Sequence, residues 1–131
     1  MFYALPTKAP QLGEIFDPSN KLRCGICLRL ISEVQNLAII NGITPFHTFT
    51  NPNGQTFNLM TLNFCHGLVN ATPPMSEHSW FKGYDWIIEL CGTCHEHLGW
   101  KFQLNLLPSL SPESPSTFWG MIKDRLIASE T

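Results

Sequence analysis

Residues 86–104 read WIIELCGTCHEHLGWKFQL, and this stretch decides the fold. Large apolar residues occupy every second position, at 86, 88 and 90 before the two cysteines and at 98, 100, 102 and 104 after them. Side chains of a strand alternate between the two faces of a sheet, so this period predicts a strand on each side. We therefore expect a β-hairpin whose turn is Cys91–Cys94, with Trp86 and Trp100 able to project from the same face.

A second Cys-x-x-C motif lies near the start of the chain, at Cys24 and Cys27. Two such pairs present four thiolates that can close a tetrahedron around zinc. Residues 28–90 separate the pairs, so a whole sheet must lie between them. A disulfide framework fits poorly, because the cysteines number five and the chain is expected to be intracellular. We expect one structural Zn²⁺, which would contribute folding energy on the order of 10 kcal/mol, held by Cys24, Cys27, Cys91 and Cys94.

Other interpretations of these cysteines are a redox-active dithiol or buried free thiols. His95 or His97 could also replace a thiolate as a metal ligand, although His97 is expected instead to donate a hydrogen bond near the second strand. A site of four thiolates has no open coordination position, so its role is predicted to be structural and not catalytic. The fifth cysteine, Cys65, is expected to be a buried apolar residue.

Length and composition limit the remaining possibilities. The chain has 131 residues, enough for one domain, with 44% hydrophobic and only 14% charged residues. Its net charge of −2 and scattered Lys and Arg argue against nucleic acid as a partner. No apolar stretch is long enough to span a membrane, and the start lacks the pattern of a signal peptide. We expect an intracellular protein, cytoplasmic or nuclear; a secreted form would require a signal peptide trimmed from this sequence.

The rest of the chain divides at residue 20. Residues 1–20 carry three of the ten prolines and are expected to form an N-terminal arm, followed by a zinc-binding domain over 21–131. Within it, 28–40 is expected to hold a strand with irregular ends. Segments 46–50 and 55–62 flank a turn at 51–54, which ends in Asn-Gly and predicts a hairpin. Residues 105–116 are expected to be a surface loop, and 118–127 a strand that frays into a short turn.

Three of the four tryptophans, Trp80, Trp86 and Trp100, lie around the second cysteine pair, and Gly83 allows the chain to bend between the first two. Three indoles meeting at near right angles would enclose a small dry box, suited to a quaternary ammonium or to a neutral ring. The competing interpretation is ordinary core packing, which is usual for aromatic residues on alternating strands. Trp119 is assigned to the core.

Four segments in this order, HSWFKGYDW at 78–86, CGTC at 91–94, HLGWKF at 97–102 and FWGM at 118–121, resemble the thalidomide-binding (CULT) domain of the cereblon family. The resemblance covers most of residues 22–127. It implies an all-β fold with little helix, in which two antiparallel sheets are pinned at a zinc-bearing apex, an arrangement called a β-tent.

The resemblance also implies a binding site and no enzymatic activity. Trp80, Trp86 and Trp100 would form the walls of a cage and Phe102 its floor, while His78 and the Trp80 backbone would bond the edge of an imide. Asn51 would lie at the rim. The implied ligands are neutral cyclic imides: glutarimide, thalidomide-type compounds, uracil-like rings and the cyclic imides of protein termini.

Some properties of the family do not carry over. Cereblon also has a Lon domain and a region that docks onto a ubiquitin ligase, and 131 residues cannot hold these, so the link to a ligase is not inferred. Two other functions compete. A methyl-lysine reader would use the same indoles through cation–π contacts. An enzyme resembling B-type methionine sulfoxide reductases would need a reactive cysteine after the second pair, yet none follows Cys94 and Phe118-Trp119-Gly120 occupies that stretch.

Overall fold

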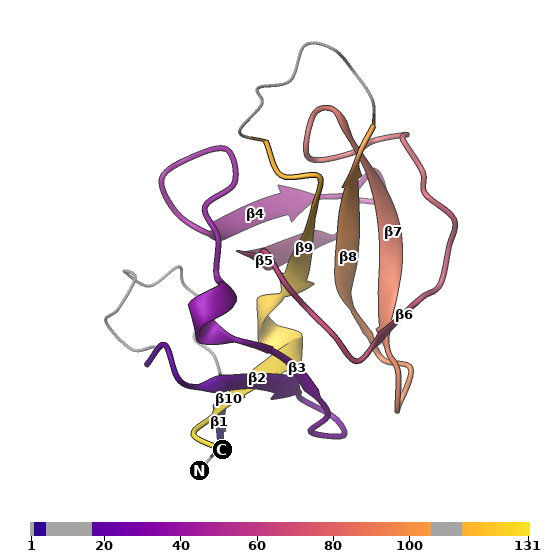
Figure 1. Cartoon of the computed structure of the whole chain (residues 1–131). Helices are drawn as coiled ribbons and strands as arrows, with labels where there is room; N and C mark the ends of the chain where they lie inside the picture. The colour runs from indigo at the N-terminus through magenta and orange to yellow at the C-terminus, as the bar shows by residue number, and fades with distance from the viewer. Residues whose placement is uncertain (1, 5–16, 106–113) are drawn as a thin grey trace.

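The computed structural model describes residues 2–4, 17–105 and 114–131, which form strands and two single-turn 3-10 helices (Figure 1). The strands are β1 (Phe2–Ala4), β2 (Lys21–Cys24), β3 (Leu30–Glu33), β4 (Phe46–Thr50), β5 (Thr56–Leu62), β6 (Leu68–Asn70), β7 (Tyr84–Cys91), β8 (His97–Leu104), β9 (Thr117–Ile122) and β10 (Leu126–Ser129), and the 3-10 helices are η1 (Val34–Asn36) and η2 (Lys123–Arg125). The predicted all-β class is confirmed.

The strands form two antiparallel sheets, also as predicted. The large sheet has the order β4-β5-β9-β8-β7-β6, and the small sheet has the order β1-β10-β2-β3. Figure 1 shows β7 and β8 side by side in the large sheet, with β2, β3 and β10 below them. The chain passes from the large sheet to the small one at η2, which follows β9 and precedes β10.

The β7–β8 hairpin has the predicted form. Trp86 pairs with Phe102 and Ile88 pairs with Trp100, so these four side chains share one face of the sheet. The next strand, β9, places Gly120 opposite Trp100. A Cβ atom at Gly120 would lie 3.0 Å from the Phe102 ring, so this glycine leaves the room that the ring occupies.

The β4–β5 hairpin is also confirmed. Phe49 pairs with Phe57 across it, and Gly54 in its turn adopts the left-handed conformation, with φ of +85°. The Asn51 side-chain oxygen accepts a hydrogen bond of 2.9 Å from the backbone N–H of Gln55. This bond fixes the shape of the turn and therefore the position of residues 51–55.

The core consists of two apolar clusters. One lies around the small sheet and the cysteines, and its buried members include Leu22, Ile31, Leu62, Leu98, Met121 and Leu126. The other lies on the face of β7 and β8 that carries Trp86 and Trp100, and it is mostly aromatic, with Phe57, Phe81, Trp100, Phe102 and Phe118 among its buried residues. Burying one such side chain stabilises the fold by about 1.5–3 kcal/mol. The aromatic cluster therefore gives a rigid base to the face that carries the tryptophans.

Some elements differ from the expectations. The strand expected within 28–40 is short, covering β3 alone, and η1 follows it. The strand that frays into a turn is confirmed as β9 and η2, but a further strand, β10, follows and was not expected. Of the expected N-terminal arm, residues 2–4 pair with β10 as β1, and 5–16 lie outside the described residues. Most of the expected loop at 105–116, residues 106–113, lies outside them too.

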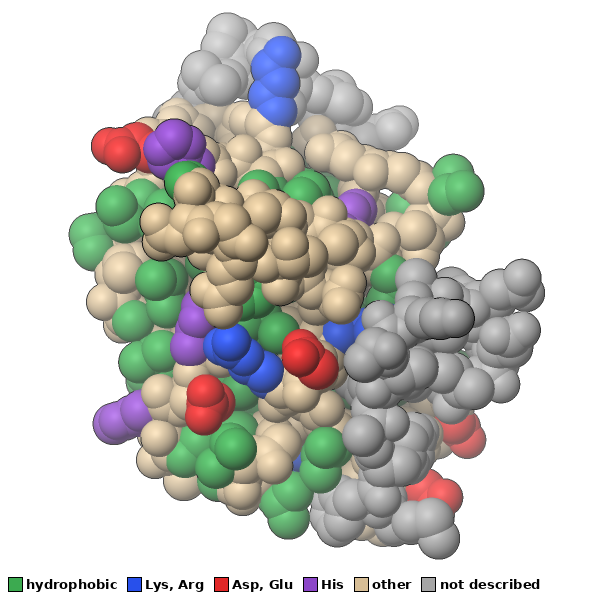
Figure 2. All heavy atoms as spheres, turned by 180° about the vertical axis from the view of Figure 1, so that it is seen from behind, with side chains coloured by type: hydrophobic (Ala, Val, Ile, Leu, Met, Phe, Trp, Pro, Cys, Tyr) green, Lys and Arg blue, Asp and Glu red, His purple; other side chains and the backbone are tan. Residues whose placement is uncertain are grey.

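The surface carries few charges. On the face shown in Figure 2, basic and acidic side chains of the described residues lie interspersed among apolar and neutral polar ones. In the described part of the chain, no helix has the length and apolar character needed to cross a membrane.

Candidate functional site

The four paired cysteines form one cluster. The Sγ atoms of Cys24, Cys27, Cys91 and Cys94 all lie within 4.8 Å of one another. The closest pairs, Cys24 with Cys94 and Cys27 with Cys91, are 3.6 and 3.5 Å apart, much too far for a disulfide bond of about 2.05 Å. Four sulfurs at about 2.3 Å from a tetrahedral Zn²⁺ would lie about 3.8 Å apart, so these residues fit a metal ion of this kind.

Two matched turns bring the sulfurs together. The residue that follows each pair, Leu28 or His95, has a positive φ, of 68° and 64°. Each also donates its backbone N–H to the carbonyl of the first cysteine, at 2.9 Å in both turns. Burial raises the pKa of the Cys24 thiol to about 12, and a cation beside this sulfur would favour its thiolate form. The described cluster contains no histidine, so neither His95 nor His97 takes a place in it.

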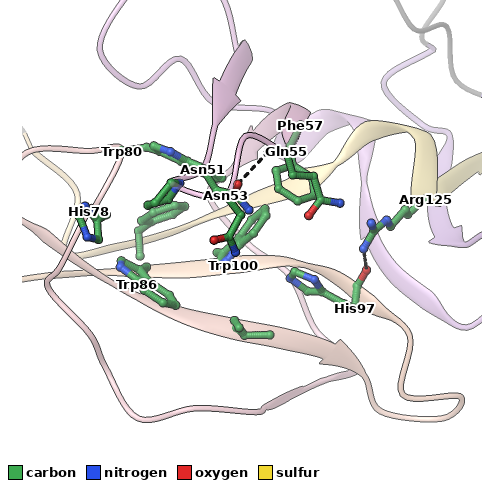
Figure 3. Close-up of a pocket in the computed structure, with 13 residues that line it drawn as sticks. Asn51, Asn53, Gln55, Phe57, His78, Trp80, Trp86, His97, Trp100 and Arg125 are labelled. Carbon is green, nitrogen blue, oxygen red and sulfur yellow. Dashed lines mark hydrogen bonds between the residues drawn. The ribbon is translucent and has the colours of Figure 1, made fainter.

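An aromatic pocket lies farther along the same hairpin, with a cavity of about 440 Å³ (Figure 3). This volume falls within the range usual for small-molecule sites. The structure brings all six residues predicted for ligand binding into its lining: Asn51, His78, Trp80, Trp86, Trp100 and Phe102. Their role in binding a ligand stays a prediction.

Two of the three indoles meet nearly at right angles. The ring centroids of Trp80 and Trp100 are 4.9 Å apart, with 77° between the planes. Trp86 is fixed by its indole N–H, which donates to the Glu77 carbonyl at 2.6 Å. Phe102, only 1% exposed, closes the base. Neighbouring rings thus hold Trp80 and Trp100, and a hydrogen bond holds Trp86.

The Trp80 wall rests on a stack of rings from β4. Phe49 stacks on Trp80 at 5.1 Å with 8° between the planes, and His47 stacks on Phe49 at 5.5 Å with the same small angle. Trp80 belongs to the loop between β6 and β7, which has no strand partner at this point. Side-chain stacking therefore holds this wall, whereas Trp86 and Trp100 are held by strand pairing.

Comparison with known proteins supports the resemblance seen in the sequence. No family model matches the chain. Curated relatives do: cereblon of Gallus gallus is 35% identical over 63% of the chain, and cereblon of Danio rerio is 30% identical over 87% of it. Cereblon of Drosophila erecta is 26% identical over 88%. The chain is a cereblon-like (CULT) domain. It spans 18%, 26% and 19% of these three relatives, about a fifth of their length.

The pocket of this cereblon-like domain includes residues that sequence reasoning missed. They are Pro52, Asn53, Gln55, Phe57, Ile88, His97 and Arg125. Ile88 could have been found, because it lies two positions from Trp86 and shares its face. Phe57 could also have been found, because the register of the β4–β5 hairpin pairs it with Phe49, close to the turn that carries Asn51. Arg125 had no signal in the sequence, because it reaches the pocket from η2, after the change between sheets.

His97 lies at the wall beside Trp100, with ring centroids 4.8 Å apart. Its Nε2 is 3.0 Å from the Gly99 carbonyl, which can only accept, so the ring donates this hydrogen bond, as predicted. Burial, more than any other influence, lowers the pKa of His97, so the ring is neutral near pH 7. Its other nitrogen then carries no proton.

The residues assigned to structural roles lie away from the pocket. Trp119 packs against the first apolar cluster, with the Lys101 ammonium 5.7 Å from its ring centroid. Cys65 is buried as expected, and burial raises the pKa of its thiol. His47, on β4, was expected from its sequence to hold a satisfied core or surface position, and this is wrong, because its Nε2 is buried without a hydrogen-bond partner among the described residues. The ring is held there by stacking instead.

Proposed function

We propose that this domain binds neutral cyclic imides and uracil-like rings, including glutarimide, thalidomide-type ligands and the cyclic imides of protein termini, and that it catalyses no reaction. The observation that carries this proposal is the near-perpendicular meeting of Trp80 and Trp100 at the cavity. A flat or puckered ring can place its apolar faces against such walls. Its polar edge lies in the plane of the ring and stays free to form hydrogen bonds.

The polar edge of the ligand would face the loop before β7. An imide has one N–H donor between two carbonyl acceptors, so it needs both an acceptor and donors within a few ångströms. We assign these to His78, which is exposed at the pocket mouth, and to the Trp80 backbone. His78 has a φ of 59°, a conformation that favours glycine and turns the chain sharply at this position.

The size of the ligand is consistent with useful affinity. Glutarimide has roughly eight non-hydrogen atoms, and the best small ligands gain up to about 1.5 kcal/mol per atom. Micromolar binding requires about 8 kcal/mol, or roughly 1 kcal/mol per atom. A ring enclosed by three preformed indole walls can reach this value.

We propose that the four cysteines hold one structural Zn²⁺. Each pair belongs to a different sheet: Cys24 ends β2, and Cys91 ends β7. A metal ion at the cluster would therefore join the small sheet to the hairpin that carries Trp86 and Trp100. Elemental analysis of the purified protein should give one zinc per chain, and none after replacement of a cysteine.

The lining of the pocket argues against a methyl-lysine reader. Such readers usually place a carboxylate near the aromatic rings, but the described lining contains no Asp or Glu and does contain the cation Arg125. An enzyme like methionine sulfoxide reductase is also disfavoured. The cysteine outside the cluster, Cys65, is buried and absent from the pocket lining, and the pKa of its thiol is raised.

We take residues 21–131 as the binding domain and 1–20 as an arm attached to it. Five cysteines, none in a disulfide among the described residues, favour a reducing compartment inside the cell. A protein terminus that ends in a cyclic imide would be a natural partner.

Calorimetric titration of the zinc-loaded protein with glutarimide, uridine and trimethyl-lysine tests this function. We expect saturable binding of glutarimide, weaker or similar binding of uridine, and none of trimethyl-lysine. Trp100→Ala should abolish binding while zinc content stays at one per chain, and Trp119→Phe should bind normally. Absence of glutarimide binding at millimolar concentration, or preference for trimethyl-lysine, would refute the proposal.

A further inference from the structure

The pocket continues beyond the indoles to a positively charged end. Figure 3 shows Arg125 and His97 at the side of the cavity away from His78 and Trp80. Arg125 donates one hydrogen bond from Nη1 to the His97 backbone carbonyl, at 2.8 Å. Its guanidinium carbon lies 5.8 Å from the centroid of the Phe57 ring. The cation is thus directed along the wall of the same cavity that the tryptophans enclose.

The charge of Arg125 has no partner of opposite sign in the described part of the chain. Among these residues, Lys21 forms an ion pair with Glu33, and neither residue lines the pocket. Glu96 and Asp124 neighbour His97 and Arg125 in sequence, but neither lines the cavity. A guanidinium has five N–H donors and stays protonated in proteins. A half-buried cation with spare donors at the end of a binding pocket is suited to an anion.

The neighbouring polar groups add no second charge. The Nε2–H of His97 is already donated to the Gly99 carbonyl, so this ring offers no donor to an anion. Gln55 lines the same end, and its amide can donate but carries no charge. Arg125 is therefore the residue on which recognition of an anion would depend.

We propose that the natural ligand joins a cyclic-imide or uracil-like ring to an anionic oxygen group, a carboxylate or a phosphate, and that Arg125 binds this group. The inference rests on the proposed function, because the ring must occupy the indole cage for its substituent to extend toward Arg125. Under this proposal, Arg125 determines which of the ligands that carry the same ring bind most tightly, because it favours those with an anionic group.

Arg125 also has a structural contact that a test must separate from this role. Its backbone carbonyl accepts the N–H of Gly25, in the turn between Cys24 and Cys27, at 3.0 Å. That contact is made by the backbone and survives a change of side chain. The bond to the His97 carbonyl needs a donor but no positive charge, so Arg125→Lys and Arg125→Gln differ chiefly in the charge presented to the cavity.

The experiment compares pairs of ligands that share a ring and differ in whether they carry an anionic group, by calorimetry on the zinc-loaded full chain. One pair is uridine and uridine 5′-monophosphate. The other is 3-aminoglutarimide acylated with N-acetylasparagine or with N-acetylaspartate. We expect an acidic member to bind about tenfold more tightly than its neutral match at low salt, since hydrogen bonds to charged groups are the stronger ones. Raising the salt concentration should reduce this preference.

Variants locate the effect. Arg125→Gln should reduce the ratio of the affinities for the acidic and the neutral ligand to about one, and should keep the affinity for the neutral ligand within about threefold of that of the unchanged protein. Arg125→Lys should keep most of the preference for the acidic ligand. Lys82→Gln, which removes an exposed cation absent from the cage lining, is the matched control and should change nothing. If Arg125→Gln does not fold, Arg125→Met, which also removes the charge, takes its place; a ratio of about one on the unchanged protein overturns the inference in either case.

The outcomes are distinct. A preference for the phosphate in one pair, or for the carboxylate in the other, supports the inference and identifies the source of the anion. Binding of the neutral rings with no gain in either pair overturns the inference and leaves the proposed function standing. If neither neutral ring binds, the proposed function itself fails.

Discussion

The turn and the middle of the β7–β8 hairpin are built from the same alternating sequence, yet their side chains surround very different spaces. At the turn, Cys91 and Cys94 meet two sulfurs from the small sheet, all within 4.8 Å. In the middle, Trp86 and Trp100 border a cavity of about 440 Å³. Four sulfurs can saturate one ion and leave no position open. The rings line this space without filling it.

Under the functions proposed above, one region would supply stability and the other recognition. The cysteine cluster joins strands from both sheets, so its loss should unfold the domain whatever the ligand. The cage belongs to one sheet and one loop, so changes there should alter binding more than folding. Substitutions in the two regions therefore separate the two properties.

The largest effect is expected at the cluster. Cys91→Ser, or removal of metal by a chelator, should cost free energy of unfolding on the order of 10 kcal/mol, comparable with the whole stability of a small domain. The protein should lose its cooperative urea transition and its zinc. Cys65→Ala is the control, because it removes a buried thiol outside the cluster, and it should keep the zinc and a cooperative transition. A chelated protein with an unchanged urea midpoint would contradict the assignment.

The next effect is expected in the cage. Trp100 is 8% exposed and contacts the rings of Trp80, Phe57 and His97. Trp100→Ala should destabilise the domain by about 3–5 kcal/mol and abolish glutarimide binding, with zinc content unchanged. Urea unfolding and calorimetry measure the two effects on the same sample. Glutarimide binding by Trp100→Ala with the affinity of the unchanged protein would show that the ligand binds elsewhere.

The sequence predicted both regions because each depends on local patterns. Cys-x-x-C spacing predicted the cluster, and the period of two predicted that Trp86 and Trp100 share a face. Trp80 lies in a loop, and its place in the cage came from the family resemblance. Residues that reach the pocket through the arrangement of the two sheets were missed. Arg125 is the main example, since its position depends on where β9 ends and on how η2 crosses to the small sheet, which no local pattern encodes.

A smaller effect is expected behind the Trp80 wall. Burial lowers the pKa of His47 from its usual value of 6.5. The unfolded chain therefore binds a proton at higher pH than the folded one. The stability that neutral His47 contributes is present above about pH 6.5 and is lost as the pH falls through the lower pKa of the folded state.

His47→Phe should remove this dependence and the unpartnered Nε2 atom, while keeping a ring to stack on Phe49. We expect a gain of about 1 kcal/mol, larger at pH 5.5 than at pH 8. Urea midpoints at the two pH values, with excess zinc, measure it. Thr50→Val, at an exposed position of the same strand that carries no titratable group, is the control and should leave the difference between the two midpoints unchanged. Equal gains at both pH values would contradict the assignment to His47.

The indole N–H signals in a ¹⁵N NMR spectrum of the zinc-loaded protein test the central claim most directly, because the four tryptophans divide between the cage and the opposite face. Addition of glutarimide should shift the signals of Trp80, Trp86 and Trp100 along saturable curves with one dissociation constant, and leave Trp119 in place. If none of the cage signals moves at saturating glutarimide, or if Trp119 shifts together with them, the indoles do not form the binding site.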